Sequence, residues 1–189
     1  MRSGDSDDRR SRTATLESFA DTIVPGEKRT PDDRAIAGAA TGGGAVAAGA
    51  VELLEQPAPG LAAGLDHYAA GLNAHAEAYA AEHGVDLETG LPAFVALPFE
   101  HRTALVARLT APGHPEKDGW VLLALFCTMA FDTAPHMRTA DALAAGHPGL
   151  ATMGFAPPQA DGLWRFGEFS YGRQLADLHP ATTPSGSPA

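Results

Sequence analysis

Histidine is the residue type in this chain best suited to bind a metal ion, and the sequence contains eight of them. His67 and His75 fall on one predicted helix, but eight residues separate them. That spacing puts them roughly two helical turns apart, too far to share one ion. Neither H-E-x-x-H nor E-x-x-H occurs, and the single cysteine, Cys127, excludes a multi-cysteine site. We therefore expect no metal site.

Acid–base chemistry has two candidates. Asp132 and His136 are four residues apart, a spacing that would pair them on a helix, although Pro135 is expected to end the helix first. His75 lies on an apolar helical face, where a hydrogen-bonded core histidine is the commoner arrangement. If the chain binds an apolar small metabolite, we expect the pocket between the helix faces of residues 61–79 and 119–131. Its lining would be Tyr68, His75, Tyr79, Asp132 and His136.

Motifs for nucleotides and nucleophiles are absent from the sequence. No strand is predicted before the glycine run 42–44, and neither G-x-G-x-x-G nor G-x-x-x-x-G-K-[ST] occurs. We expect this run to break a helix. No G-x-S-x-G occurs, and Cys127 lies in an apolar run without cationic neighbours, which is typical of a small buried core residue. We therefore expect no catalytic residue and no cofactor on this chain.

Helical periodicity dominates the sequence, whereas runs of alternating β-branched residues are missing, so the predicted fold class is all-α. We expect an irregular bundle of about six to seven helices. The strongest pattern covers residues 61–83 and ends at Gly84. Further helices are predicted at 15–24, from Thr30 as N-cap to the glycine run, and at 45–55, 119–131 and 138–145. Another helix is expected to follow Pro98 and to be closed by residues 111–113. Residues 119–131 are the most apolar, and we expect them at the centre of the bundle.

One helical domain, residues 13–179, is predicted between two tails. Residues 1–12 are polar and charged, and residues 180–189 offer no hydrophobic anchor, so both tails are expected to be disordered. Within the domain, residues 155–175 form an extended aromatic-rich segment, because prolines and glycines interrupt it. Its rings either cover the chain's own helices or dock on another protein. The predicted partner-binding residues are Phe155, Trp164, Arg165, Phe166, Phe169, Tyr171 and Arg173.

The formal net charge of -10 indicates which partners to exclude. An acidic surface repels phosphate backbones and anionic lipid headgroups, so neither nucleic acid nor a membrane is an expected partner. The pair Arg9–Arg10 hints at a twin-arginine export signal, but no apolar segment follows it. We therefore expect a cytoplasmic protein.

Two stretches resemble a known family. The stretch Leu16–Gly26, which leads to Thr30-Pro31-Asp32 and an Ala/Gly-rich run, resembles the opening of the gluconate 2-dehydrogenase subunit 3 family. The segment Gly154–Pro158 with Leu163–Arg173 is similar to the closing segment of its actinobacterial members. The resemblance covers most of residues 15–175. It implies a helical accessory subunit of a glucose–methanol–choline-type flavin oxidoreductase, with FAD on the partner.

Two functional hypotheses result, and a third interpretation is a structural bundle without a partner, in which Trp164 and Phe166 pack on the chain's own helices. The first is a non-catalytic accessory subunit or maturation chaperone for such an oxidoreductase, in which residues 155–173 and the loop 25–31 form the contact surface. Specialised metabolism is one setting for that partner. The alternative is a stand-alone helical enzyme or a binder of an apolar small metabolite.

Overall fold

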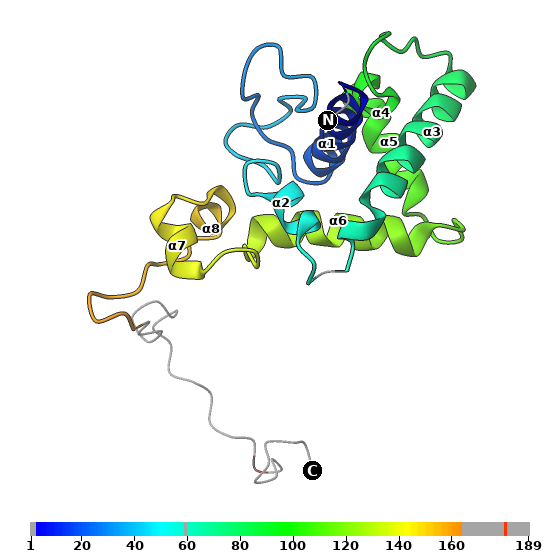
Figure 1. Ribbon diagram of the computed structural model, residues 1–189. Helices are drawn as coiled ribbons and strands as arrows, with labels where there is room; N and C mark the ends of the chain where they lie inside the picture. Colours follow the sequence, from blue (N-terminus) through cyan, green and yellow to red (C-terminus); the bar gives the residue numbers. More distant parts are fainter. Residues whose placement is uncertain (1–2, 59, 164–179, 181–189) are drawn as a thin grey trace. The chain divides into compact units, whose positions relative to one another are not determined.

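The computed structural model describes residues 3–58, 60–163 and 180. The chain divides into two compact units, residues 1–155 and 156–189. The described residues form helices and no strand, which confirms the all-α fold class (Figure 1). The helices are α1 (Ser3–Ile23), α2 (Ala50–Glu55), α3 (Leu65–His83), α4 (Ala93–Ala96), α5 (Phe99–Leu109), α6 (Lys117–Asp132), α7 (Thr139–Ala144) and α8 (Pro148–Thr152), with a 3-10 turn at Ala62–Gly64.

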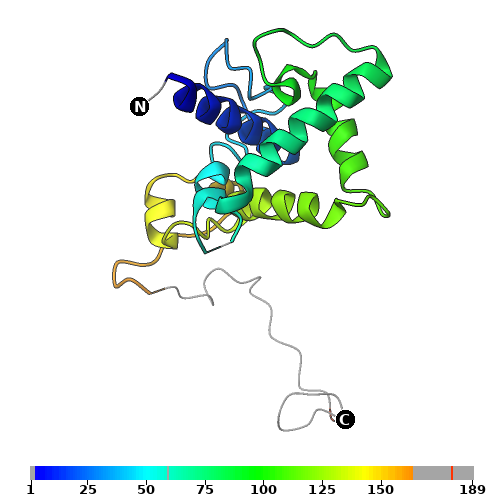
Figure 2. The same ribbon diagram turned by 45° about the vertical axis from the view of Figure 1, so that its right-hand side comes forward.

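Helix α1 contacts α2, α3, α4, α5 and α6, and Figure 2 shows α3 crossing its C-terminal half. Leu16, Phe19 and Ala20 are completely buried, and their spacing places them on one helical face. The Phe19 ring packs 6.4 Å from Phe94 and 6.5 Å from Trp120 between centroids. The central helix is therefore α1, and the expectation that residues 119–131 hold this place is wrong. Helix α6 buries one face and exposes the other.

The N-terminal segment differs from its prediction as a disordered tail. Helix α1 begins at Ser3, twelve residues before the predicted start at Thr15. Two ion pairs explain why this segment is ordered as far as Arg12. Arg12 pairs with Glu55 of α2 at 2.5 Å and with Asp66 of α3 at 3.4 Å. These contacts tie this part of α1 to two neighbouring helices.

The loop 24–49 replaces a predicted helix. The expectation of a helix from Thr30 to the glycine run is wrong, and residues 45–49 form turns ahead of α2. Tertiary hydrogen bonds take the backbone groups that a helix would use. The Ala35 carbonyl accepts from Ser18, and the N–H of Ala37 donates to Asp21 at 2.9 Å. Asp21 also accepts from the N–H of Gly26 at 3.1 Å. Side chains of α1 therefore help to hold this loop.

Glycine allows α8 to approach the end of α6 closely. A Cβ built on Gly149 would lie 1.6 Å from the carbonyl oxygen of Phe131, so no other residue fits at this crossing. Helices α7 and α8 enclose a small second core of Ala134, Ala142 and Leu150, against which Leu143 packs.

The predicted partner-binding residues from 164 to 173 lie outside the described residues. No helix in the described part of the chain is long and apolar enough to cross a membrane.

Candidate functional site

Three side chains that are distant in the sequence meet beside α3. His75 comes from α3, while His114 and Glu116 come from the loop that leads into α6. One ring nitrogen of each histidine and a Glu116 carboxylate oxygen all lie within 4.8 Å of one another. His75 Nε2 is 2.7 Å from Glu116 Oε2. We call these three residues the His–His–Glu cluster. Its donor set is one that can hold a divalent metal ion.

Two further hydrogen bonds fix the cluster. Trp120 Nε1 donates to Glu116 Oε2 at 3.3 Å, and the N–H of Glu116 donates to His114 Nδ1 at 3.2 Å. The hydrogen bonds from His75 and then from Trp120 lower the pKa of Glu116 below its ordinary value. The deprotonated carboxylate of Glu116 is therefore favoured, and this is the form that accepts hydrogen bonds and binds cations.

A cavity of about 210 Å³ adjoins the cluster. His75 and His114 line one part of it, and Tyr79 and Arg108 line another. The Tyr79 hydroxyl lies 3.3 Å from His101 Nδ1, while Arg108 pairs with Glu82 at 2.7 Å. The cavity therefore places imidazole, phenol and guanidinium groups around one small space.

The five predicted pocket residues fall into two separate groups. Tyr68, His75 and Tyr79 lie on α3, whereas Asp132 ends α6 and His136 follows it. The distance along α6 from Trp120 to Asp132 is about 18 Å at the usual helical rise. The structure therefore does not bring the five side chains into one pocket.

Trp120 fills the space where the small-molecule pocket was expected, between α3 and α6. Its indole is 4% exposed and its ring centroid lies 5.6 Å from that of Tyr68 and 5.8 Å from that of His75. A Cβ built on Gly71 would lie 3.3 Å from the indole edge. This part of the molecule is thus packed core, and Cys127 is buried in the same core as expected.

Asp132 and His136 do not form the hydrogen-bonded pair that their spacing suggested. Helix α6 ends at Asp132, before Pro135. Asp132 Oδ1 and His136 Nδ1 are both buried, and neither has a hydrogen-bond partner among the described residues. Burial, and then the nearby His147, lower the pKa of His136, while Glu52 acts in the opposite direction. A neutral His136 is therefore favoured in the folded chain.

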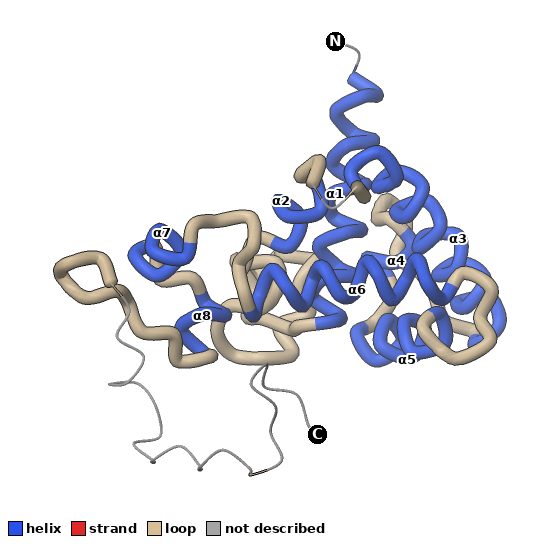
Figure 3. Tube along the Cα trace, turned by 90° about the horizontal axis from the view of Figure 1, so that it is seen from below, coloured by secondary structure: helices blue, strands red, loops and turns tan. Residues whose placement is uncertain are grey.

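The outer face of α6 is apolar and exposed. Val121, Leu122 and Leu125 are 40%, 39% and 50% exposed, and Phe126 and Met129 are partly buried beside the core. The positions 121, 125 and 129 recur every four residues, so they share one side of the helix. Figure 3 shows α6 extending along the unit, with α8 near one end and α5 near the other. We call Val121, Leu122 and Leu125 the α6 outer face.

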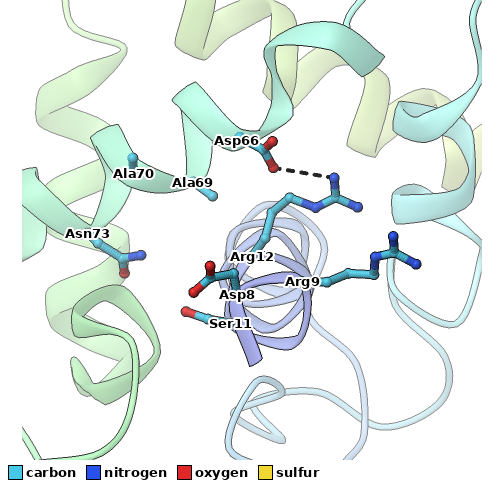
Figure 4. Close-up of a pocket in the computed structure, with 8 residues that line it drawn as sticks. All are labelled: Asp8, Arg9, Ser11, Arg12, Asp66, Ala69, Ala70 and Asn73. Carbon is cyan, nitrogen blue, oxygen red and sulfur yellow. Dashed lines mark hydrogen bonds and ion pairs between the residues drawn. The ribbon is translucent and has the colours of Figure 1, made fainter. Parts of the chain in front are cut away.

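An open polar groove of about 590 Å³ lies between α1 and α3 (Figure 4). Arg12 extends from α1 towards Asp66, and Asp8 and Ser11 lie on the side of α1 nearer Asn73. Arg12 is already paired with Glu55 and Asp66, while Asp8 adds a negative charge and Arg9 a positive one. Opposite charges of this kind offset each other, so the groove has no clear preference for anions or cations.

His114, Glu116 and Trp120 were not among the functional candidates predicted from the sequence. His114 and Glu116 are two residues apart just before a helix, which is the one local signal available. Their partner His75 lies 39 residues earlier than His114, and only the path of the chain joins them. Of the predicted partner-binding residues, Phe155 is described and is 45% exposed.

Comparison with curated proteins and with solved structures finds no match for this chain. Residues 10–189 match the family described as "Family of unknown function (DUF5987)". The matched range contains the His–His–Glu cluster and the α6 outer face, and it leaves out only the first residues of α1.

Proposed function

This chain belongs to the DUF5987 family of unknown function, and we propose that it is an accessory subunit that binds a flavin-dependent oxidoreductase. The observation that carries the proposal is the α6 outer face. Three large aliphatic side chains are exposed to solvent on one side of a helix whose other side packs in the core. Apolar clusters on an otherwise charged surface are typical of protein–protein contacts. Burial of these side chains against a partner would stabilise the complex.

The kind of partner is inferred from the resemblance to the gluconate 2-dehydrogenase subunit 3 family. The resembling stretch Leu16–Gly26 forms the buried half of α1 and the turn after it, so the resemblance falls on residues that build this chain's helical core. We propose a glucose–methanol–choline-type flavoprotein that carries FAD. The chain's net charge of -10 favours a contact region on that partner with an apolar centre and a basic rim.

A second contact is proposed for the C-terminal aromatic segment. Phe155 is exposed directly after α8, and Trp164, Phe166, Phe169 and Tyr171 follow it outside the described residues. Arg165 and Arg173 would then supply charges at the edge of that contact. In this arrangement the chain holds its partner through two apolar elements, and no oxidation takes place on the chain itself.

The small-molecule alternative has less support. Its expected pocket is filled by Trp120, and the cavity beside the His–His–Glu cluster measures about 210 Å³. Ligand pockets of drug-sized molecules usually measure about 300–1,000 Å³. The larger groove of about 590 Å³ between α1 and α3 is polar and open, so neither hollow suits an apolar metabolite.

We propose the cytoplasm as the place where the complex forms. Arg9 and Arg10 lie within α1, where Arg10 pairs with Asp7 at 3.2 Å. The residues that follow them do not form the apolar stretch that an export signal carries. Fractionation of cells that express the chain, with immunodetection, tests this location.

Co-expression with the flavoprotein encoded nearest to this chain tests the proposed function. We expect the two proteins to co-elute, and the flavoprotein to carry more FAD than when it is expressed alone. The double variant Leu122→Asp/Leu125→Asp should abolish co-elution, because two charges would be buried without partners. A matched control, Ala104→Asp/Ala107→Asp, adds the same charges at exposed positions of α5 and should co-elute normally. If the flavoprotein folds and loads FAD equally well alone and never co-elutes, the proposal fails.

A further inference from the structure

We propose that His75, His114 and Glu116 bind one divalent transition-metal ion, with Zn²⁺ as the best fit. Two imidazoles and one carboxylate are ligands that Zn²⁺ accepts readily. This role is separate from docking, because the cluster and the α6 outer face involve different residues.

The distances are close to those of a metal site. Zn²⁺ binds nitrogen and oxygen at about 2.0–2.1 Å, so tetrahedral donor atoms lie about 3.3 Å apart. In the cluster the donor atoms lie within 4.8 Å of one another, and those of His75 and Glu116 are 2.7 Å apart. The His75 and Glu116 side chains are 33% and 53% exposed. Because both side chains are partly exposed, the small shifts that would bring them onto an ion need not disturb the core.

Neighbouring groups hold the ligands in place. Trp120 is buried in the core, and its Nε1 donates to Glu116 at 3.3 Å. The N–H of Glu116 contacts His114, which keeps these two loop residues together. Outer-shell hydrogen bonds of this kind orient metal ligands and strengthen binding. The scaffold for the ion therefore exists before the ion arrives.

The remaining coordination position would face the cavity. Three protein ligands leave a fourth tetrahedral position for water or for a small ligand. His75 and His114 both line the adjoining cavity of about 210 Å³, which has room for such a molecule. The net charge of -10 also raises the local concentration of cations near the surface.

Titration of Zn²⁺ into the tag-free, metal-stripped full chain, followed by calorimetry, tests the site. We expect one equivalent to bind. His114→Ala and Glu116→Gln should each weaken binding at least about tenfold. His67→Ala and Glu77→Gln make the same changes at exposed positions of α3 and should bind Zn²⁺ like the wild type. Absorption spectra of the Co²⁺-loaded chain provide a second readout, with tetrahedral bands that the cluster variants lose.

Two results would overturn the site. One is the absence of saturable Zn²⁺ binding to the wild type. The other is binding as tight as the wild type's in either cluster variant. Far-UV circular dichroism of each metal-free variant checks that it folds. We expect His114→Ala to keep the fold, because His114 belongs to no helix.

Discussion

Arg102 donates a hydrogen bond to the carbonyl oxygen of Ala35 at 2.9 Å, across 67 residues of sequence. The same guanidinium, 4% exposed, also donates to three further carbonyl oxygens, those of Arg34, Val95 and Leu97. Burial lowers the pKa of Arg102, and the carboxylate of Asp21 opposes that change. One side chain of α5 thereby connects the loop 24–49 with α4. It donates hydrogen bonds to four backbone carbonyl groups at these places.

Removal of this guanidinium should destabilise the fold. In Arg102→Met the four carbonyl oxygens lose their donor and Asp21 loses a nearby positive charge. We expect the free energy of unfolding to fall by about 3–5 kcal/mol, the usual effect of breaking a buried charged network. Urea denaturation monitored by circular dichroism measures the change. Arg108→Met, an exposed position on the same helix, is the control, and an equal loss there would contradict the role assigned to Arg102.

Gly149 should not tolerate a methyl group. The Cβ of Gly149→Ala would lie 1.6 Å from a backbone oxygen, so α8 must move away from α6. We expect a loss of about 3 kcal/mol or more, at the upper end of overpacking effects. At Gly64 the nearest atom to an added Cβ is 3.6 Å away, and Gly64→Ala should change stability by less than about 1 kcal/mol. Thermal melts of both variants decide the matter, and similar melting temperatures would show that the α6–α8 crossing is looser than described.

The thiol of Cys127 should be unreactive in the folded chain. Burial raises its pKa to about 12, and its side chain lies in the main core. The thiolate is the reactive form, so an aromatic disulfide reagent at pH 8 should react with it only after denaturant is added. Ala104→Cys, which places a second thiol at an exposed site of α5, should react at once. Rapid labelling of the native wild type would contradict this burial.

Stability should depend on pH through His136. Its pKa in the folded chain is lowered by burial and by His147, so the unfolded chain takes up the proton more readily. The free energy of unfolding should therefore fall as the pH drops below about 6.5, the ordinary histidine value, towards the lowered folded value. In His136→Gln this loss between pH 7.5 and 5.5 should be smaller. His67→Gln, at an exposed position of α3, should keep the wild-type dependence, and an unchanged slope in His136→Gln would refute the assignment.

Local patterns in the sequence determined several of the helices. The face of residues 61–83 predicted α3, and Gly84 ends it with a left-handed φ of 65°, as expected of a C-terminal glycine. Periodicity also located α5 and α6, and the apolar surroundings of Cys127 predicted its burial. These features depend on residues within a few turns of one another, so they can be derived without knowing the fold.

Contacts between residues distant in the sequence decided the loop 24–49, the packing of the helices and the His–His–Glu cluster. Thr30, Pro31 and two aspartates are a strong helix start, yet no helix follows, because Ser18, Asp21 and Arg102 bind the backbone of the loop instead. The position of α1 at the centre, the exposure of α6 and the meeting of His75 with His114 and Glu116 likewise follow from how the helices pack. Spacing along the chain determines which side chains share a helical face. Which faces meet depends on burial and hydrogen bonding over the whole unit, and the tertiary structure alone decides that.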